Sequence, residues 1–328
     1  MHALLLGIEI GGTKVQVATG NSRGRIASLW RGAVSPRAGA AALRRQILFG
    51  ADQVLRGRTP AGVGVGFGGP VDWRSGRVRV SHHVAGWTNF PLAKWLARRL
   101  GARVFVDNDA NVAALGEARL GVGRGGDPVF YLTVGSGIGG GLVVGGRFYH
   151  GAEPGEMEIG HTRVPREGVP SERWPILESL ASGWAVDRRI RAAARRAPRS
   201  PLARLLSRAE GPPASVLFRA ARRGDPSARR ILDDLVDHLA LGFSHALHLA
   251  HPRILVLGGG LSLLGEPLRR AITARLERLA MEVFRGTWRL RLAGLGESAV
   301  PVGALLLAGD RLAEGDRFPR RRPRLRDG

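Results

Sequence analysis

The sequence of 328 residues contains no cysteine, which excludes disulfide bonds, thiolate zinc sites and cysteine nucleophiles. It has no apolar run near the roughly 20 residues that a membrane-spanning helix needs. The first ten residues carry no basic segment, and the apolar run Ala3–Leu6 stops at Gly7, unlike an ordinary signal peptide. We therefore expect a cytoplasmic protein with no membrane partner.

Lysine is almost absent too: of the 50 basic residues only Lys14 and Lys94 are lysine. The formal net charge of +23 is compatible with an anionic partner, but arginine spread along an Ala- and Gly-rich chain is typical of a GC-rich genome and a solvated surface. Functional basic surfaces usually cluster. Clusters occur here only around Arg188–Arg199, Arg219–Arg230 and Arg317–Arg326. Nucleic acid is therefore not the expected partner, and polyanion binding by these clusters stays the alternative.

Predicted strands and helices alternate along the chain, which indicates an α/β architecture. Short apolar runs that end in glycine predict strands, and helical apolar spacing predicts helices. The expected strands are Leu4–Ile10, Val15–Thr19, Gly62–Phe67, Val104–Val106, Val129–Val134, which opens a strand-rich block through Val143–Tyr149, and Ile254–Leu257. The expected helices are Ala38–Leu55, Pro91–Leu100, Asp109–Leu120, Ser227–Leu249 and Val302–Ala308, with a helical hairpin within Arg191–Pro213. Two strand–glycine-turn–strand starts, at Leu4 and Phe130, indicate two related domains.

Three glycine-rich turns directly follow predicted strands. They comprise Gly11, Gly12, Thr13 and Lys14; Gly135, Ser136 and Gly137 within the run GSGIGGG; and Gly258, Gly259 and Gly260. A glycine backbone approaches a ligand closely and exposes N–H groups to phosphate oxygens. Each turn alone is explained equally well as a plain tight turn, but three at strand ends point to a nucleotide. None has the spacing of a P-loop or of the dinucleotide-binding fingerprint.

The polar run Asp107-Asn108-Asp109 follows a predicted strand and opens a predicted helix. Asp and Asn are favoured there as helix caps, because their side chains accept hydrogen bonds from the free N–H groups of the first turn. Alternatively, one carboxylate faces a ligand cleft, since open α/β sheets bind ligands at the carboxyl ends of strands. Phosphoryl transfer to an alcohol needs a carboxylate that accepts the hydroxyl proton. The residues alone leave both interpretations open.

The segment GAEPGEMEIGH contains Glu153, Glu156, Glu158 and His161. A carboxylate and an imidazole three residues apart suit the hydroxyls of a polyol or a metal ion. As a zinc site the pair is incomplete, because zinc takes three or four protein ligands. Taken alone, the segment is explained as a surface loop.

Six motifs, in order along the chain, resemble those of the ROK family of bacterial sugar kinases and sugar-responsive repressors. They are Glu9–Thr13 (EIGGT), Gly66–Asp72 (GFGGPVD), Val106–Glu117 (VDNDANVAALGE), Thr133–Gly141 (TVGSGIGGG), Glu158–His161 (EIGH) and Ile254–Ser262 (ILVLGGGLS). The resemblance runs from Leu4 to about Ala308. It implies the actin-like, ribonuclease-H-like ATPase fold, in which two related α/β domains hold ATP in the cleft between them. We accordingly expect an N-terminal domain over residues 1–120, a C-terminal domain over 121–299, a helix at about 300–312 that packs back on the first domain, and a disordered basic tail over 313–328.

The resemblance also implies a role for individual positions. Asp109 would be the general base for the sugar hydroxyl. Sugar contacts would come from Gly69, His83, Asn108, Glu158, His161 and Glu178. The three glycine turns, with Thr13, Lys14 and Ser136, would hold the phosphates of ATP around Mg²⁺, and Glu9 would face the metal directly or through water. The implied enzyme is a glucokinase-like homodimer that phosphorylates the 6-hydroxyl of a hexose.

Three departures from the family pattern limit what the resemblance implies. The segment Pro165–Leu177, where the family carries a cysteine-rich zinc knuckle, has no cysteine, so we expect no structural zinc and a loop held by packing of Trp174 and Pro175. Glu9 replaces the customary aspartate. His83 stands where many relatives carry asparagine.

Other functions stay open at this stage. An amino sugar or N-acetylated hexosamine is an alternative acceptor, and polyphosphate is an alternative donor. A ROK-type repressor would need a helix-turn-helix module ahead of the core, yet the first core strand is predicted to begin about four residues in. A non-catalytic protein that binds sugar or polyanions is the remaining alternative.

Overall fold

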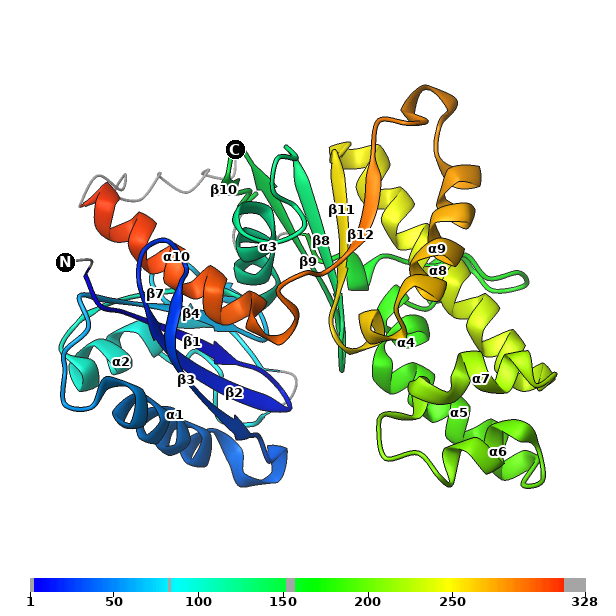
Figure 1. Ribbon diagram of the computed structural model, residues 1–328, viewed down its shortest axis with the longest axis horizontal. Helices are drawn as coiled ribbons and strands as arrows, with labels where there is room; N and C mark the ends of the chain where they lie inside the picture. The colour runs from blue at the N-terminus through cyan, green and yellow to red at the C-terminus, as the bar shows by residue number, and fades with distance from the viewer. Residues whose placement is uncertain (1–2, 82–83, 152–156, 316–328) are drawn as a thin grey trace.

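The computed structural model describes residues 3–81, 84–151 and 157–315 (Figure 1). It contains two five-stranded sheets with the same design. The first has the order β3-β2-β1-β4-β7 and the second the order β10-β9-β8-β11-β12. In each sheet three antiparallel strands come first in the chain, and two further strands then run parallel to the first of them. The predicted α/β architecture of two related halves is confirmed.

The strands at the centre of each sheet are short and buried along their whole length, which is why they appear in the sequence as continuous apolar runs. The first sheet consists of β1 (Leu5–Ile10), β2 (Lys14–Gly20), β3 (Ile26–Ala33), β4 (Gly62–Phe67) and β7 (Arg103–Asn108). The second consists of β8 (Val129–Val134), β9 (Ile138–Val144), β10 (Arg147–Phe148), β11 (Ile254–Gly258) and β12 (Arg289–Leu292). A small hairpin of β5 (Val71–Asp72) and β6 (Arg77–Val78) follows β4.

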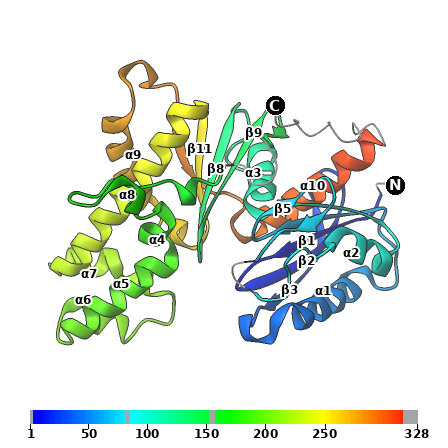
Figure 2. The ribbon, with the colours of Figure 1, turned by 180° about the vertical axis from the view of Figure 1, so that it is seen from behind.

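Helices cover the outer face of each sheet (Figure 2). The first sheet packs against α1 (Gly39–Leu55) and α2 (Leu92–Leu100). The second packs against a helical layer that contains α4 (Leu177–Ala181), α5 (Gly183–Arg196), α6 (Pro201–Leu206), α7 (Leu217–Arg222), α8 (Pro226–Ala250) and α9 (Glu266–Leu279). The helical hairpin expected within Arg191–Pro213 is present as the end of α5 followed by α6.

Two further helices lie between the sheets. Figure 1 shows α10 (Ala299–Glu314) crossing β1 and β4, with α3 (Asp109–Arg119) between α10 and strands β8 and β9. Ala113 and Ala114 of α3 pack on the second sheet, whereas Val112 and Leu115 pack on α10. The two sheets are thus joined through a pair of helices that lie far apart in the sequence. Helix α10 ends at Glu314, two residues inside the segment assigned to the tail, and residues 316–328 lie outside the described part.

Strand β3, helix α9 and strand β12 were not predicted. Strand β3 lies at the edge of its sheet and alternates between half-buried and exposed residues, so it has no continuous apolar run. Helix α9 buries only Leu268, Ile272 and Leu276, one residue per turn, among charged neighbours. Within the described residues no helix is long and apolar enough to cross a membrane.

Candidate active site

The second and third glycine turns lie side by side at the ends of two neighbouring parallel strands, β8 and β11. Gly259 has a φ of +77°, and a Cβ there would lie 2.6 Å from the backbone of Val134, so this turn rests directly on the end of β8. In contrast, a Cβ on Gly135 or Gly260 would have no atom within 4 Å. Backbone N–H groups beside such open space suit the oxygens of a phosphate chain.

The turn Gly135–Gly137 is held in place by α4 and by the first residue of α5. Gly183 donates its N–H to the carbonyl of Gly135 at 2.8 Å, and Ile138 donates its N–H to Oε2 of Glu178 at 2.7 Å. A side chain at Gly137 would collide with the Glu178 carboxylate. Glu178, for which the resemblance implies a sugar contact, also supports the second glycine turn with one of its two oxygens.

The three residues of the run Asp107-Asn108-Asp109 have separate tasks. Asn108 is the cap of α3, and its Oδ1 accepts hydrogen bonds from the backbone N–H groups at positions 110 and 111. Its Nδ2 donates to the carbonyl of Gly69 at 3.2 Å. Asp109 lies against Gly68, where a Cβ would be 3.2 Å from Oδ2 of Asp109. The capping interpretation is therefore confirmed for Asn108, and a ligand-facing carboxylate at Asp109 stays a prediction.

The Asp109 carboxyl holds its proton more tightly than an ordinary aspartate, so its pKa is raised. Its pKa is raised to about 6, mainly by burial and also by the negative charge of Glu158, while a backbone hydrogen bond from Ala110 and the charge of Lys14 work in the opposite direction. These electrostatic effects show that three segments lie near one another, since Lys14 belongs to the first glycine turn and Glu158 lies in the segment that leads to His161. A carboxylate with a pKa near the working pH is well suited to accept a proton.

Glu9, at the end of β1, is 6% exposed, and both of its oxygens have partners. Oε2 accepts a hydrogen bond from Nε2 of Gln16, and Oε1 lies 3.6 Å from Nζ of Lys14. Burial raises the pKa of Glu9 to about 7, opposed by the charge of Lys14 and the hydrogen bond from Gln16. Gln16 is completely buried and also donates to the carbonyl of Glu297, so it links Glu9 to the start of α10. The sequence analysis did not indicate this role for Gln16, because its burial and its two acceptors become visible only in the structure.

Glu158 and His161 are close to each other but exposed, with Oε2 and Nδ1 3.6 Å apart. Among the described residues no group of three or more histidine, aspartate or glutamate side chains is placed to hold a metal ion. The loop expected to replace the zinc knuckle is fastened by the indole N–H of Trp174, which donates to the carbonyl of Val169 at 2.8 Å. His83, Glu153 and Glu156 lie outside the described residues.

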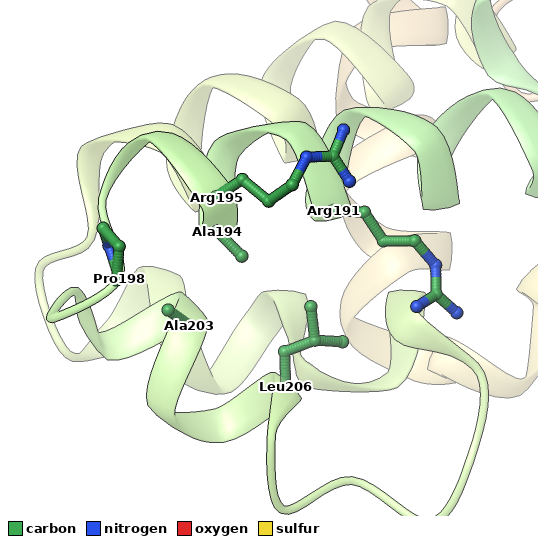
Figure 3. Close-up of a pocket in the computed structure, with 6 residues that line it drawn as sticks. All are labelled: Arg191, Ala194, Arg195, Pro198, Ala203 and Leu206. Atoms are coloured by element: carbon green, nitrogen blue, oxygen red, sulfur yellow. The ribbon is translucent and has the colours of Figure 1, made fainter.

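One small cavity lies in this region, and a larger groove lies apart from it. The small cavity touches the first glycine turn and is lined by Gly11, Gly12, Gly68 and Trp87 among others. A surface groove of about 470 Å³ lies between α5 and α6 and is lined by Arg191, Ala194, Arg195, Pro198, Ala203 and Leu206 (Figure 3). None of the predicted site residues lines this groove, so it is separate from the candidate active site.

Comparison with known proteins agrees with this arrangement. The model of the ROK family matches residues 5–311. The chain belongs to the ROK family. It is 34% identical over 310 residues to the glucokinase of Thermotoga maritima, covering 94% of this chain and 98% of that protein.

Two solved structures show the same fold. One is a ROK family glucokinase from Streptomyces griseus in complex with glucose and AMPPNP, with a TM-score of 0.80, 32% identity, and coverage of 94% of this chain and all of that one. The other is a ROK hexokinase from Thermus thermophilus, with a TM-score of 0.76, 30% identity, and coverage of 95% and 100%. The ROK family chain described here accordingly has the actin-like ATPase fold, and the likenesses support an ATP-dependent hexose kinase.

Proposed function

We propose that this protein is an ATP-dependent hexose kinase that phosphorylates the 6-hydroxyl of glucose or a similar hexose, with Asp109 as the general base. The observation that carries the proposal is the Asp109 carboxyl, which has a pKa of about 6 and lies against Gly68 within the electrostatic reach of Lys14 and Glu158. Around it the chain supplies glycine turns for phosphates and polar side chains for a polyol.

The proposed reaction needs little covalent chemistry from the protein. Asn108, Glu158 and His161 orient the sugar, and ionised Asp109 takes the proton from its 6-hydroxyl. The freed oxygen forms a bond to the γ-phosphorus while the bond between that phosphorus and the bridging oxygen of ADP breaks. The backbone N–H groups of the three glycine turns hold the phosphate chain in line, and exclusion of water strengthens these contacts.

Magnesium would act at Glu9, where it supplies positive charge that offsets the charge of the phosphates. The Glu9 carboxylate is buried and already paired with Lys14 and Gln16, which fits a metal contact through water better than direct coordination. Lys14 lies beside the first glycine turn, so its ammonium group adds a second positive charge on the phosphate side.

The sequence-based expectations of a cytoplasmic location, where ATP is available, and of a homodimer are part of this proposal. The acceptor and the donor each have an alternative, an amino sugar or N-acetylated hexosamine in place of glucose and polyphosphate in place of ATP. Of these, glucose and ATP agree with the glucokinase likenesses.

The proposal is tested by a coupled assay of ADP release with purified protein over a panel of hexoses, with sugar-phosphate formation measured for both ATP and polyphosphate. We expect turnover with ATP, Mg²⁺ and glucose and little without Mg²⁺. Product from N-acetylated hexosamines alone would move the acceptor to the alternative class. No phosphorylated product from any sugar with either donor would overturn the proposal.

A further inference from the structure

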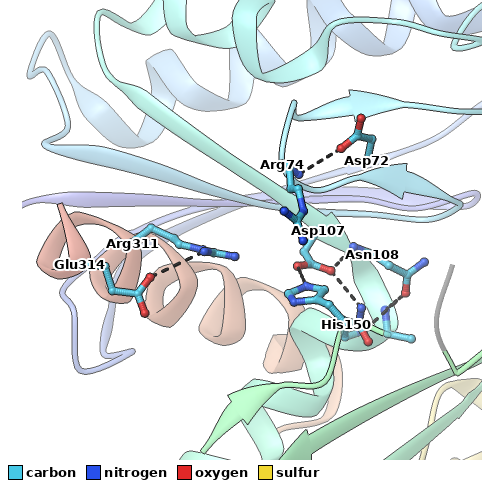
Figure 4. A network of polar contacts seen from close by, with 9 residues as sticks. Asp72, Arg74, Asp107, Asn108, His150, Arg311 and Glu314 are labelled. Atoms are coloured by element: carbon cyan, nitrogen blue, oxygen red, sulfur yellow. Dashed lines mark hydrogen bonds and ion pairs between the residues drawn. The ribbon is translucent and has the colours of Figure 1, made fainter. Parts of the chain in front are cut away.

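Next to the first turn of α3 lies a partly buried polar and aromatic cluster formed by Trp73, Asp107, His150 and Arg311. Figure 4 shows Asp107, His150 and Arg311 of this cluster. Its members come from four separate places: the turn after β5, the end of β7, the segment after β10, and α10. Asp107 is 1% exposed and His150 is 14% exposed as a side chain. None of the activity described above uses these residues.

The cluster is built around one short contact. Nε2 of His150 lies 2.6 Å from Oδ2 of Asp107. The other oxygen of Asp107 accepts the backbone N–H of Asn108 at 2.8 Å and Nδ2 of Asn111 at 3.0 Å. Asp107 is therefore tied on one side to the first turn of α3, where Asn108 and Asp109 lie, and on the other side to His150.

The imidazole is itself held in place by aromatic packing. The His150 ring stacks on Trp73 with centroids 4.3 Å apart and an angle of 18° between the planes. The guanidinium groups of Arg74 and Arg311 lie 4.8 and 4.9 Å from the centroid of the Trp73 ring, a cation–π arrangement. A ring held between fixed neighbours keeps its Nε2 at one point.

His150 also connects the two sheets. It follows β10 of the second sheet, whereas Asp107 lies next to the end of β7 of the first sheet. The β5–β6 hairpin that carries Trp73 begins just after Gly69, the acceptor of the Asn108 side chain. The contact thus spans the two halves directly behind the residues assigned to the sugar and its proton.

We propose that His150 is a positioning residue: through its hydrogen bond to Asp107 it fixes the start of α3, and with it the Asn108 amide and the Asp109 carboxylate. This inference rests on the proposed function of Asp109. Without the imidazole, one oxygen of Asp107 is left buried without its partner, and a buried carboxylate in that state turns or draws in water. The strand-to-helix turn then shifts, and the sugar and its base lose their alignment.

The test separates the hydrogen bond from the ring. His150→Gln keeps an amide nitrogen near the position of Nε2, because both side chains place that nitrogen the same number of bonds from Cα. The Gln side chain has no ring, so it loses the stacking on Trp73. His150→Phe keeps a ring on Trp73 but loses the donor. We expect His150→Phe to lower kcat and raise the KM for glucose, each by about tenfold or more, while His150→Gln recovers most of both. The KM for ATP should stay within about twofold in both variants, because the glycine turns do not contact the cluster.

A matched control exists in the second half of the chain. His251 likewise stacks on an aromatic ring, Phe284, at 4.0 Å, and its Nε2 lies 2.9 Å from Oγ1 of Thr287. His251→Phe should leave kcat and both KM values unchanged. If His150→Phe does not fold, Asp107→Asn breaks the same contact from the other side and should give the same split between the two KM values.

Three results would overturn the proposal: unchanged kcat and glucose KM in His150→Phe, equal losses in the Phe and Gln variants, or a rise in the KM for ATP as large as that for glucose. Glucose binding measured by calorimetry on the same variants reports on Asn108 without turnover. Asp109→Asn is assayed in parallel, because normal turnover in that variant contradicts the proposed base. The glucose binding measured by calorimetry on the His150 variants does not depend on that outcome.

Discussion

At the scale of single residues, the proposed mechanism depends on the carboxylate of Asp109, whose burial disfavours its charged form. The pKa of Asp109 is about 6 in the folded protein against an ordinary value of 3.8. The folded chain therefore binds this proton more tightly than the unfolded chain, and between these two values the free energy of unfolding falls as pH rises. Above about pH 6 the ionised Asp109 carboxylate lowers the free energy of unfolding by a constant amount. The proposed base, which works near neutral pH, therefore reduces the stability of the fold.

The first prediction is that Asp109→Asn loses activity and gains stability. We expect kcat to fall by roughly 10²- to 10⁴-fold, the usual contribution of a general base. At pH 7.5 the melting temperature should rise, because a neutral amide removes a buried charge that costs about 1–3 kcal/mol; near pH 4 this gain should vanish. Activity and thermal unfolding are both measured, with Asp52→Asn on the exposed side of α1 as the control that changes neither. A variant that keeps its turnover would remove Asp109 from its role.

The second prediction concerns pH. Because only ionised Asp109 accepts a proton, kcat at saturating glucose should fall as pH decreases through about 6, by about tenfold per pH unit below it. Glu9, with a pKa of about 7, is the other group that titrates nearby. The same profile recorded for Glu9→Gln should keep its decline near pH 6. Constant kcat between pH 5 and 8 would contradict the assignment.

The sequence predicted Asp109 and Asn108 by their place after a buried strand, and it predicted the glycine turns by composition. It did not indicate the contact between Asp107 and His150, because the two residues are 43 positions apart and meet only when the two sheets are assembled. The sequence also did not indicate that Glu178 supports the second glycine turn. The local helical pattern around Glu178 contains no information about the distant N–H of Ile138.

At the scale of elements, buried strands that end in glycine were easy to recognise, and β4 and β8 have the predicted bounds. Strand β3 was not predicted because an edge strand needs only one covered face, and its sequence alternates without an apolar run. Glycine is required at the strand ends for a geometric reason. The third turn, with Gly259 in the left-handed region and pressed on Val134, leaves no room for a side chain.

The third prediction uses this turn. Gly259→Ala adds a methyl group 2.6 Å from the Val134 backbone, which must push the turn out of place. We expect the KM for ATP to rise by about tenfold or more while the KM for glucose changes little. The control is Gly286→Ala, since Gly286 has the same φ of +77° but open space around its Cβ. That variant should lose about 1 kcal/mol of stability from backbone strain and keep both KM values. Equal kinetic behaviour of the two variants would contradict a nucleotide role for the third turn.

At the scale of the whole molecule, α3 and α10 join the two halves, and α3 begins at the proposed base Asp109. The helices meet at glycine, because a Cβ on Gly303 would lie 1.8 Å from the carbonyl oxygen of Val112. Similarly, a Cβ on Gly64 would lie 1.9 Å from the carbonyl oxygen of Ala304, where α10 crosses the first sheet. The resemblance implied a helix that packs back on the first sheet, but such close backbone contact follows only from the assembled fold.

The fourth prediction tests this joint. Gly303→Ala should destabilise the protein by about 1–3 kcal/mol or more, as overpacking in a tight core does. The separation of α3 and α10 should also move the start of α3, so kcat should fall at temperatures well below the melting point. Thermal unfolding and the coupled assay check both effects. A melting temperature equal to that of the unsubstituted protein would show that the helices are packed less closely than described.

The most direct test of the central claim is a crystal structure of the protein with glucose, Mg²⁺ and a non-hydrolysable ATP analogue. We expect a carboxylate oxygen of Asp109 within about 2.6–3.2 Å of the sugar O6, and we expect O6 to face the γ-phosphorus. A structure in which the Asp109 carboxylate points away from the sugar, with another group at O6, would contradict this claim.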